Sequence, residues 1–157
     1  MTSRTDTHLP DGQLPPDPDI DANDPERIDR PVHLRWRYLG VVALGGAIGT
    51  AARDGLSTAF PAQQEVSWAI FWINIAGALL LGVLLEHLAH RGPDEGRRRT
   101  LRLLLGTGVL GGFTTYSTLA VESATLPPPL GAAYLASTVL LGAVAGLAGV
   151  LLGRRLA

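Results

Sequence analysis

Residues 67–89 read SWAIFWINIAGALLLGVLLEHLA, an apolar stretch whose single acidic residue, Glu86, comes near its end. A helix needs about 20 apolar residues to cross a hydrocarbon core of about 30 Å. Similar stretches lie at about 38–59, 101–123 and 130–152, joined by short links, and none shows the charged stripe of a soluble bundle. Only helices satisfy every backbone group in lipid without closing a barrel. The sequence therefore predicts an all-α integral membrane protein of four antiparallel transmembrane helices.

Residues 1–34 differ from the rest of the chain in composition. They hold eight of the fourteen acidic residues, six of the eleven prolines and three arginines, so their formal charge is 3 − 8 = −5. Such a segment buries too little apolar surface to offset its ordering entropy. We expect a disordered, acidic, Pro-rich tail at 1–34, followed by a transmembrane domain at 35–157. The absence of cysteine excludes disulfides and thiolate chemistry. His87 and His90 have a spacing that suits zinc, or they lie at the membrane interface.

The basic residues predict the orientation of the helices. The chain has no lysine, and the two links at 60–66 and 124–129 contain no arginine. Both termini are therefore predicted to face the cytoplasm, because basic residues accumulate on that side. The arginines that flank the helices on the predicted cytoplasmic side are Arg35, Arg37, Arg91, Arg97, Arg98, Arg99, Arg102, Arg154 and Arg155.

Two clusters of polar or small residues interrupt the first two apolar stretches. The glycines at 45–49 allow another backbone to approach closely, and packing alone accounts for them. Arg53 either snorkels, pairs with Asp54 or lines a water-filled vestibule that attracts anions. Asn74 either makes an interhelical hydrogen bond or donates its amide to an anion. An intramembrane polar group is a functional hypothesis in either case.

The third cluster, residues 106–119, reads GTGVLGGFTTYSTL and is the most specific of the three. Paired glycines followed by β-branched and hydroxylated residues weaken a helix in mid-membrane. A broken third helix, whose free carbonyls hold a cation and whose hydroxyls meet an ion, is one interpretation. A continuous helix with hydroxyls bonded to its own carbonyls is the other. No set of nucleophile, base and metal can be drawn from the chain, so an enzyme is not expected.

Three motifs in this order resemble the Fluc (CrcB) family of fluoride channels, and the resemblance covers nearly all of residues 38–153. They are Gly45-Gly46-x-x-Gly49-x-x-x-Arg53, Asn74-x-x-Gly77 and Gly111-Gly112-Phe113-Thr114-Thr115-Tyr116-Ser117-Thr118. The resemblance implies a fluoride-selective channel in the cell membrane that passively exports cytoplasmic fluoride and reduces its toxicity. It also implies an antiparallel dimer with a structural Na⁺ at its centre, held by backbone carbonyls that correspond to Gly111 and Thr114.

The resemblance further implies which residues line the two fluoride pores of such a dimer. Arg53 and Glu122 would lie in the vestibules. In place of the family's two phenylalanines this chain has Tyr116, which keeps an electropositive ring edge, and Leu119, which does not. The implied pore residues are Asn74, Tyr116, Ser117, Thr118, Leu119, Tyr134 and Thr138.

Two other functions remain open from the sequence. A small proton-coupled multidrug exporter is also a four-helix chain, but it needs a carboxylate deep in the membrane, whereas Asp54, Glu86 and Glu122 lie toward helix ends. A structural assembly subunit would not call for the polar residues of the second and third helices. The arginine asymmetry also predicts that this chain inserts into the membrane in a single orientation. An antiparallel dimer would then need a paralogous partner chain of the opposite orientation, and membrane lipid would surround both chains.

Overall fold

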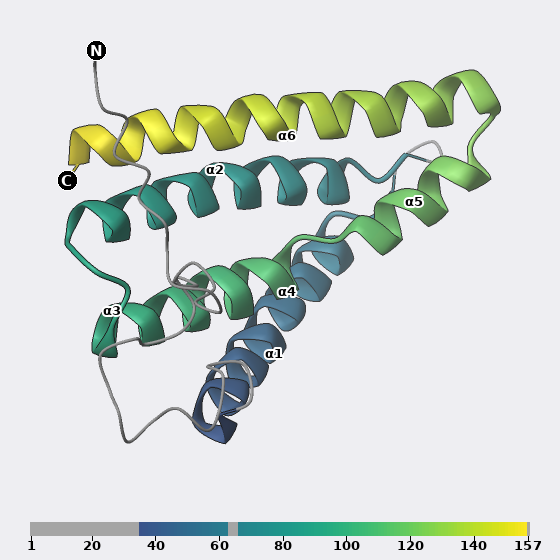
Figure 1. Ribbon diagram of the computed structural model, residues 1–157. Coiled ribbons are helices and arrows are strands. Elements are labelled where there is room, and N and C mark those ends of the chain that lie inside the picture. Colours follow the sequence, from purple (N-terminus) through teal and green to yellow (C-terminus); the bar gives the residue numbers. More distant parts are fainter. Residues whose placement is uncertain (1–34, 63–65, 157) are drawn as a thin grey trace, which may run out of the picture.

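The computed structural model describes residues 35–62 and 66–156, and the predicted tail at 1–34 lies outside them. The described residues form helices and no β-strand. Figure 1 shows their course from the start of α1 to the end of α6. The elements are α1 (Trp36–Ala59), α2 (Trp68–His90), α3 (Gly96–Leu101), the π-helix η2 (Arg102–Leu110), α4 (Gly111–Phe113), α5 (Tyr116–Thr125) and α6 (Pro128–Leu156).

Within the described residues, three helical stretches are long and apolar enough to cross a membrane, and they correspond to three of the four predicted spans. They are Trp68–His90, Gly96–Thr125 and Pro128–Leu156. The fourth predicted span, at about 38–59, forms helix α1 of 24 residues, which is long enough but less apolar than the others. The helix α6 begins within the proline run, because proline lacks only an N–H that is unpaired in a first turn.

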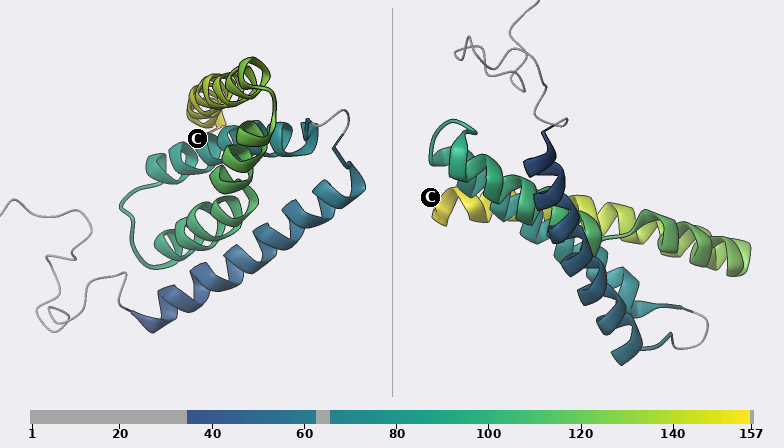
Figure 2. Two further views of the ribbon diagram at one scale, coloured as in Figure 1. Left: turned by 90° about the vertical axis from the view of Figure 1, so that its right-hand side faces the viewer. Right: turned by 90° about the horizontal axis from the view of Figure 1, so that it is seen from below.

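The helices pack as two pairs. In one pair α1 crosses η2 and α4, and in the other α2 lies along α6 (Figures 1 and 2). Glycines make both contacts close: a Cβ on Gly45 would lie 2.9 Å from the Cα of Gly108, and one on Gly149 would lie 3.1 Å from the carbonyl carbon of Leu79. The packing interpretation is thereby confirmed for Gly45 and Gly49, which are four residues apart, whereas a Cβ on Gly46 would meet nothing within 4 Å.

The third predicted span changes its partner half-way along. Its first part, η2 and α4, packs on α1, whereas its second part, α5, packs on α6. Nothing in the sequence indicated the π-helical geometry of η2, in which the N–H of Gly111 donates to the carbonyl of Gly106 five residues earlier. A π-helix is rare and frequently marks a functional site. The crossing from one helix pair to the other occurs at Thr114 and Thr115, where the helix is interrupted.

The buried apolar core is small and lies at one end of the molecule. It joins the start of α2 to α5 and the start of α6. Elsewhere large apolar side chains of α6, such as Leu140, Val144, Leu147 and Leu151, are exposed. Exposed apolar helices of this length suit lipid surroundings rather than water. The core residues are Val66, Ile70, Phe71, Ile73, Leu119, Leu126 and Tyr134.

Charged side chains at the opposite ends of these helices form ion pairs. Glu86 accepts hydrogen bonds from His90 at 3.0 Å and from Arg154 at 2.8 Å, and so links α2 to α6. Asp94, in the link before α3, pairs with Arg102 at 2.7 Å. These contacts gather the ends of α2 and α6 and the start of α3 on one side of the molecule (Figure 1).

Candidate functional site

The interruption of the third predicted span is two residues long. The α-helical backbone ends at Phe113; Thr114 and Thr115 have extended backbone angles (ψ 155° and 127°), and α5 begins at Tyr116. The hydroxyl of Thr114 donates to the Leu110 carbonyl at 2.9 Å and its N–H donates to the same atom at 3.0 Å. The hydroxyl thus bonds back to its own helix, as the continuous-helix alternative expected, although the helix itself does not continue.

Asn74 on α2 supplies the hydrogen bonds that the interrupted backbone lacks. Its side-chain nitrogen donates to the Thr115 carbonyl at 3.0 Å, and its side-chain oxygen accepts from the Thr115 N–H at 2.8 Å. The amide therefore pairs with one residue's backbone in both directions, as a neighbouring strand would. Asn74 thus makes the interhelical hydrogen bond that was one alternative. It could also donate to an anion, the other alternative, because the primary amide has a second N–H.

The interruption also removes helical donors from two carbonyls. In a continuous helix the Gly111 carbonyl would accept from the N–H of Thr115, and the Thr114 carbonyl from the N–H of Thr118. Here the first N–H donates to Asn74 and the second to the hydroxyl of Thr115. Oxygen atoms that lose their donors in this way are suitable ligands for a hard cation.

Hydroxyl groups gather at the start of α5. Thr115 caps this helix, since its hydroxyl accepts from the Thr118 N–H at 3.3 Å. The same oxygen lies 3.2 Å from the Ser117 hydroxyl and donates to the Thr118 hydroxyl at 3.1 Å. Thr115 was not among the predicted pore residues, although a threonine three residues before Thr118 is a pattern typical of a helix N-cap.

A groove of about 340 Å³ runs past the interruption and is open along one side. It brings together α2, η2, α4, α5 and the middle of α6. The groove combines amide, hydroxyl and backbone groups with small residues, and none of the described residues that line it is charged. Its lining residues are Asn74, Gly77, Ala78, Leu81, Gly106, Leu110, Gly111, Thr114, Thr115, Tyr116, Leu119, Thr138, Val139 and Gly142.

The two residues that replace the phenylalanine pair differ in their surroundings. Tyr116 is 73% exposed and projects from the first turn of α5 at the edge of the groove. Leu119 is 3% exposed and packs into the apolar core while also contributing to the groove wall. The ring of Tyr116 is thus exposed at the surface of this chain, whereas Leu119 contributes to the packing of the chain itself.

Tyr134 and Thr138 lie one turn apart on α6, but only Thr138 lines the groove. Thr138 is 2% exposed, lines the groove and donates back to the Tyr134 carbonyl at 2.7 Å. The Tyr134 hydroxyl donates toward the carboxylate of Glu122 at 2.9 Å and toward the carbonyl of Ser67 at 3.0 Å. Tyr134 thus joins α5, α6 and the start of α2, and it is not among the residues that line the groove.

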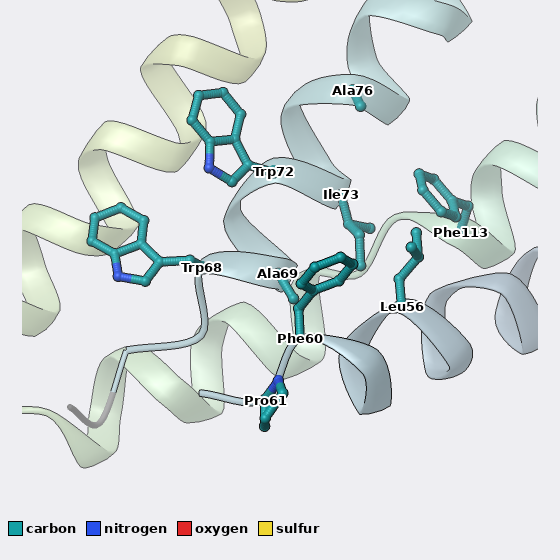
Figure 3. A pocket seen from close by; sticks show the side chains of 9 residues that line it. All are labelled: Leu56, Phe60, Pro61, Trp68, Ala69, Trp72, Ile73, Ala76 and Phe113. Carbon is teal, nitrogen blue, oxygen red and sulfur yellow. The ribbon is translucent and has the colours of Figure 1, made fainter. Parts of the chain in front are cut away.

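A larger apolar hollow of about 540 Å³ lies beside the first helix pair. Figure 3 shows it between the end of α1, with Leu56 and Phe60, and the start of α2, with Trp68 and Trp72. Phe113 closes it from α4, directly before the interruption. Both tryptophans are exposed, as the side chains of an interfacial aromatic belt are.

Known proteins match this chain over the region that contains both hollows. The profile of the family described as CrcB-like protein, Camphor Resistance (CrcB), matches residues 40–153. The chain belongs to this family. The resemblance seen in the three sequence motifs is thereby confirmed, and with its apolar helices the chain is a multi-pass membrane protein.

Several individual members of the CrcB family are similar over most of their length. A protein of Leifsonia xyli subsp. xyli named fluoride-specific ion channel FluC 2 is 54% identical over 127 residues, 78% of this chain and 88% of that protein. One of Novosphingobium aromaticivorans, named fluoride-specific ion channel FluC, is 44% identical over 120 residues, 71% and 89% of the two chains. Rhodococcus jostii has a FluC 1 that is 42% identical over 117 residues, 74% and 86%.

Proposed function

We propose that this chain is a subunit of a fluoride-specific ion channel, through which cytoplasmic fluoride leaves the cell passively. The observation that carries the proposal is the groove at the interrupted helix, where amide and hydroxyl groups converge and no charged residue of the described chain is present. The relatives named as fluoride-specific channels support the same function. Channels catalyse no chemical conversion, so the chain is not an enzyme, and the multidrug-exporter alternative has no support from these relatives.

The groups of the groove suit a small, strongly hydrated anion. Such an ion crosses a membrane only if protein dipoles replace its water, yet a fixed positive charge would bind it too tightly to release it. The second N–H of the Asn74 amide and the ring edge of Tyr116, both of residues that line the groove, are graded, uncharged donors. The hydroxyls of Ser117 and Thr118 do not belong to residues of the groove wall, but they follow directly in the first turn of α5. Thr138 and Leu119 complete the wall on the side of α6 and α5. A negative-inside potential is sufficient to drive the exit of an anion.

We assign Tyr134, Glu122 and Arg53 to the approach rather than to the groove. Tyr134 and Glu122 are hydrogen-bonded to each other at 2.9 Å, which supports a shared place at the pore entrance. Arg53 is half-buried near the end of α1, where a cation would attract anions without lying in the narrow part of their path. The roles of Arg53 and Glu122 follow the family pattern, whereas Tyr134 is moved from the implied pore lining to the approach because it does not line the groove.

The proposal includes Na⁺ bound by the carbonyls of Gly111 and Thr114 at the centre of the dimer. Both carbonyls lose their helical donors to Asn74 and Thr115, and both residues line the groove, so the oxygens present fit a hard cation. When bound, the ion would supply fixed positive charge that holds the two interrupted helices together. The residues of this chain would position those oxygens, and the hydroxyl hydrogen of Thr118, whose oxygen accepts from Thr115, would be available to the anion.

The proposed assembly has four membrane-spanning helices in each subunit, the third interrupted in mid-membrane, and two antiparallel subunits in the cell membrane. Helix α1 would be the additional span; it packs on η2 and α4 through glycines. The groove is open along one side, where the second subunit would complete the pore. Lipid would cover the exposed apolar side chains of α6.

The partner is proposed to be a different, oppositely oriented paralogous chain. Nine arginines flank the helices on one side, and the two opposite links have none, so this sequence would insert with both termini in the cytoplasm. Reporters fused to each terminus test this directly, and we expect signal from the cytoplasm only. Reporter signal from both sides, with fluoride resistance conferred by this chain alone, would instead establish a homodimer.

The proposed function is tested by fluoride efflux from liposomes that contain this chain with its candidate partner. We expect loss of fluoride, retention of chloride and no requirement for a pH gradient. The third option, an assembly subunit without transport, predicts no efflux under any of these conditions.

A further inference from the structure

Gly77 lies one turn after Asn74 on α2 and faces the interruption of the third predicted span. It is buried, and a Cβ built on it would collide with the Cγ2 methyl of Thr114. The ring carbon Cδ1 of Phe113 would lie at 3.5 Å, an ordinary contact distance. The Thr114 methyl therefore occupies the space that any other side chain at position 77 would fill.

Thr114 cannot easily turn its methyl away from Gly77. Its hydroxyl donates to the Leu110 carbonyl at 2.9 Å, which fixes the side-chain rotamer and directs the methyl toward α2. A rotation about χ1 would break this bond in the apolar part of the protein. An added Cβ at Gly77 would thus have to move the backbone of Thr114 rather than its side chain alone.

The contact differs from most of the close glycine contacts between helices in the described residues. Gly45, Gly49, Gly82 and Gly149 face the backbone of a neighbouring helix, where any larger residue would separate the two helices. Gly77 faces one methyl group of one side chain, and this group belongs to the interruption itself. The clash at Gly77 can therefore be relieved by removing a single methyl from the opposite residue.

We propose that Gly77 is a positioning residue, which seats the Thr114 methyl so that the interruption lies against Asn74. Asn74 binds the Thr115 backbone, and Gly77 receives Thr114; the two residues of the α2 motif thus hold the two residues of the break. This contact sets the location of the Thr114 carbonyl and of the hydroxyls that follow it. The effect of this contact on transport rests on the proposed function. The contact between Gly77 and Thr114 does not depend on that function.

The test is a cycle of four proteins: the unchanged chain, Gly77→Ala, Thr114→Ser and the double variant. Serine keeps the hydroxyl that bonds to Leu110 and removes only the methyl. Gly40→Ala is the matched control, because a Cβ on Gly40 meets nothing within 4 Å. In liposomes that also contain the proposed partner chain, we expect Gly77→Ala to lower fluoride flux about tenfold, the double variant to recover most of the loss, and the control to match the unchanged chain.

The Na⁺ concentration that gives half-maximal flux is a second measurement. A general loss of protein stability would not change this concentration. We expect Gly77→Ala to raise it by displacing the Thr114 carbonyl, and the double variant to restore it. A Gly77→Ala protein as active as the control, or one that Thr114→Ser does not rescue, would overturn the proposal.

Melting temperatures of the same four proteins decide the contact without any transport measurement. The proposal predicts that Gly77→Ala lowers the melting temperature more in the unchanged chain than in the protein that already carries Thr114→Ser. Additive effects would refute it. Flux of the unchanged chain decides the proposed function separately, so failure of one proposal is distinguishable from failure of the other.

Discussion

Replacement of Asn74 by leucine tests the link between the interrupted helix and transport. Leucine has the same number of side-chain heavy atoms with the same branching, but it can neither donate to the Thr115 carbonyl nor accept from the Thr115 N–H, bonds of 3.0 and 2.8 Å in the structure. The variant would therefore leave both backbone groups of one residue without their partner. The second amide N–H, which we propose to meet the anion, would be lost as well.

The size of the effect follows from these two bonds. An unpaired buried backbone group costs about 1–3 kcal/mol, whereas interhelical hydrogen bonds in membranes average about 0.6 kcal/mol. Water in the open groove would compensate part of the loss, so we take about 2 kcal/mol for the pair. This value corresponds to a decrease of roughly thirtyfold in the fraction of molecules with a correctly formed interruption. The flux should fall at least in proportion.

The assay is fluoride efflux from liposomes that contain this chain and its proposed partner, followed with a fluoride-selective electrode, at equal amounts of assembled protein. Leu147→Ala, on the exposed side of α6, is the control and should retain full flux. Size-exclusion chromatography should show the Asn74→Leu protein in the same assembly as the unchanged chain. Full flux of an assembled Asn74→Leu protein would refute both the hydrogen-bond argument and the place of Asn74 in the pore, and would leave it a packing residue.

Three further predictions concern other parts of the chain. Tyr134→Phe removes a hydroxyl that donates toward Glu122 and Ser67; calorimetry should show a loss of about 1 kcal/mol in stability, with an unchanged value arguing against this link. Deletion of residues 1–30 should leave insertion and flux near normal, because the composition of this segment gives it no part in a packed core, and a chain that fails to insert would contradict that interpretation. Flux should be equal with and without a pH gradient, since a passive channel couples no proton to fluoride; strict dependence on the gradient would favour an exporter.

The helical elements could be predicted well from the sequence because membrane spans obey a simple length and apolarity rule. The stretches at 67–89 and 130–152 correspond closely to α2 and α6, and Gly45 and Gly49 form the close contacts expected of them. The first span was harder to judge. Helix α1 has the required length, but Arg53 and Asp54 lie within it, and it is less apolar than the other three.

The details of the third span could not be predicted from residue types alone. The double glycine indicated a weak helix, but the helix is interrupted after Phe113 rather than at the glycines, since Asn74 stabilises the extended backbone of Thr115. That stabilisation comes from a residue 41 positions away. The π-helix η2 packs against α1, a contact that residue types alone did not indicate.

The site residues illustrate the same limit. Asn74, Tyr116, Leu119 and Thr138 line one groove, whereas Ser117 and Thr118 do not. Tyr134 instead bonds to Glu122 and the Ser67 carbonyl. The spacing of Tyr134 from Thr138 did not indicate these hydrogen bonds. The acceptors lie on α5 and at the start of α2, far from Tyr134 in the sequence.

The central claim, that this chain conducts fluoride as part of an antiparallel channel, is tested most directly by efflux from liposomes. The liposomes would contain this chain alone, its oppositely oriented partner alone, or both chains together. We expect rapid loss of fluoride, with retention of chloride, when both chains are present. Liposomes with both chains that retain fluoride as well as protein-free liposomes do would contradict the claim.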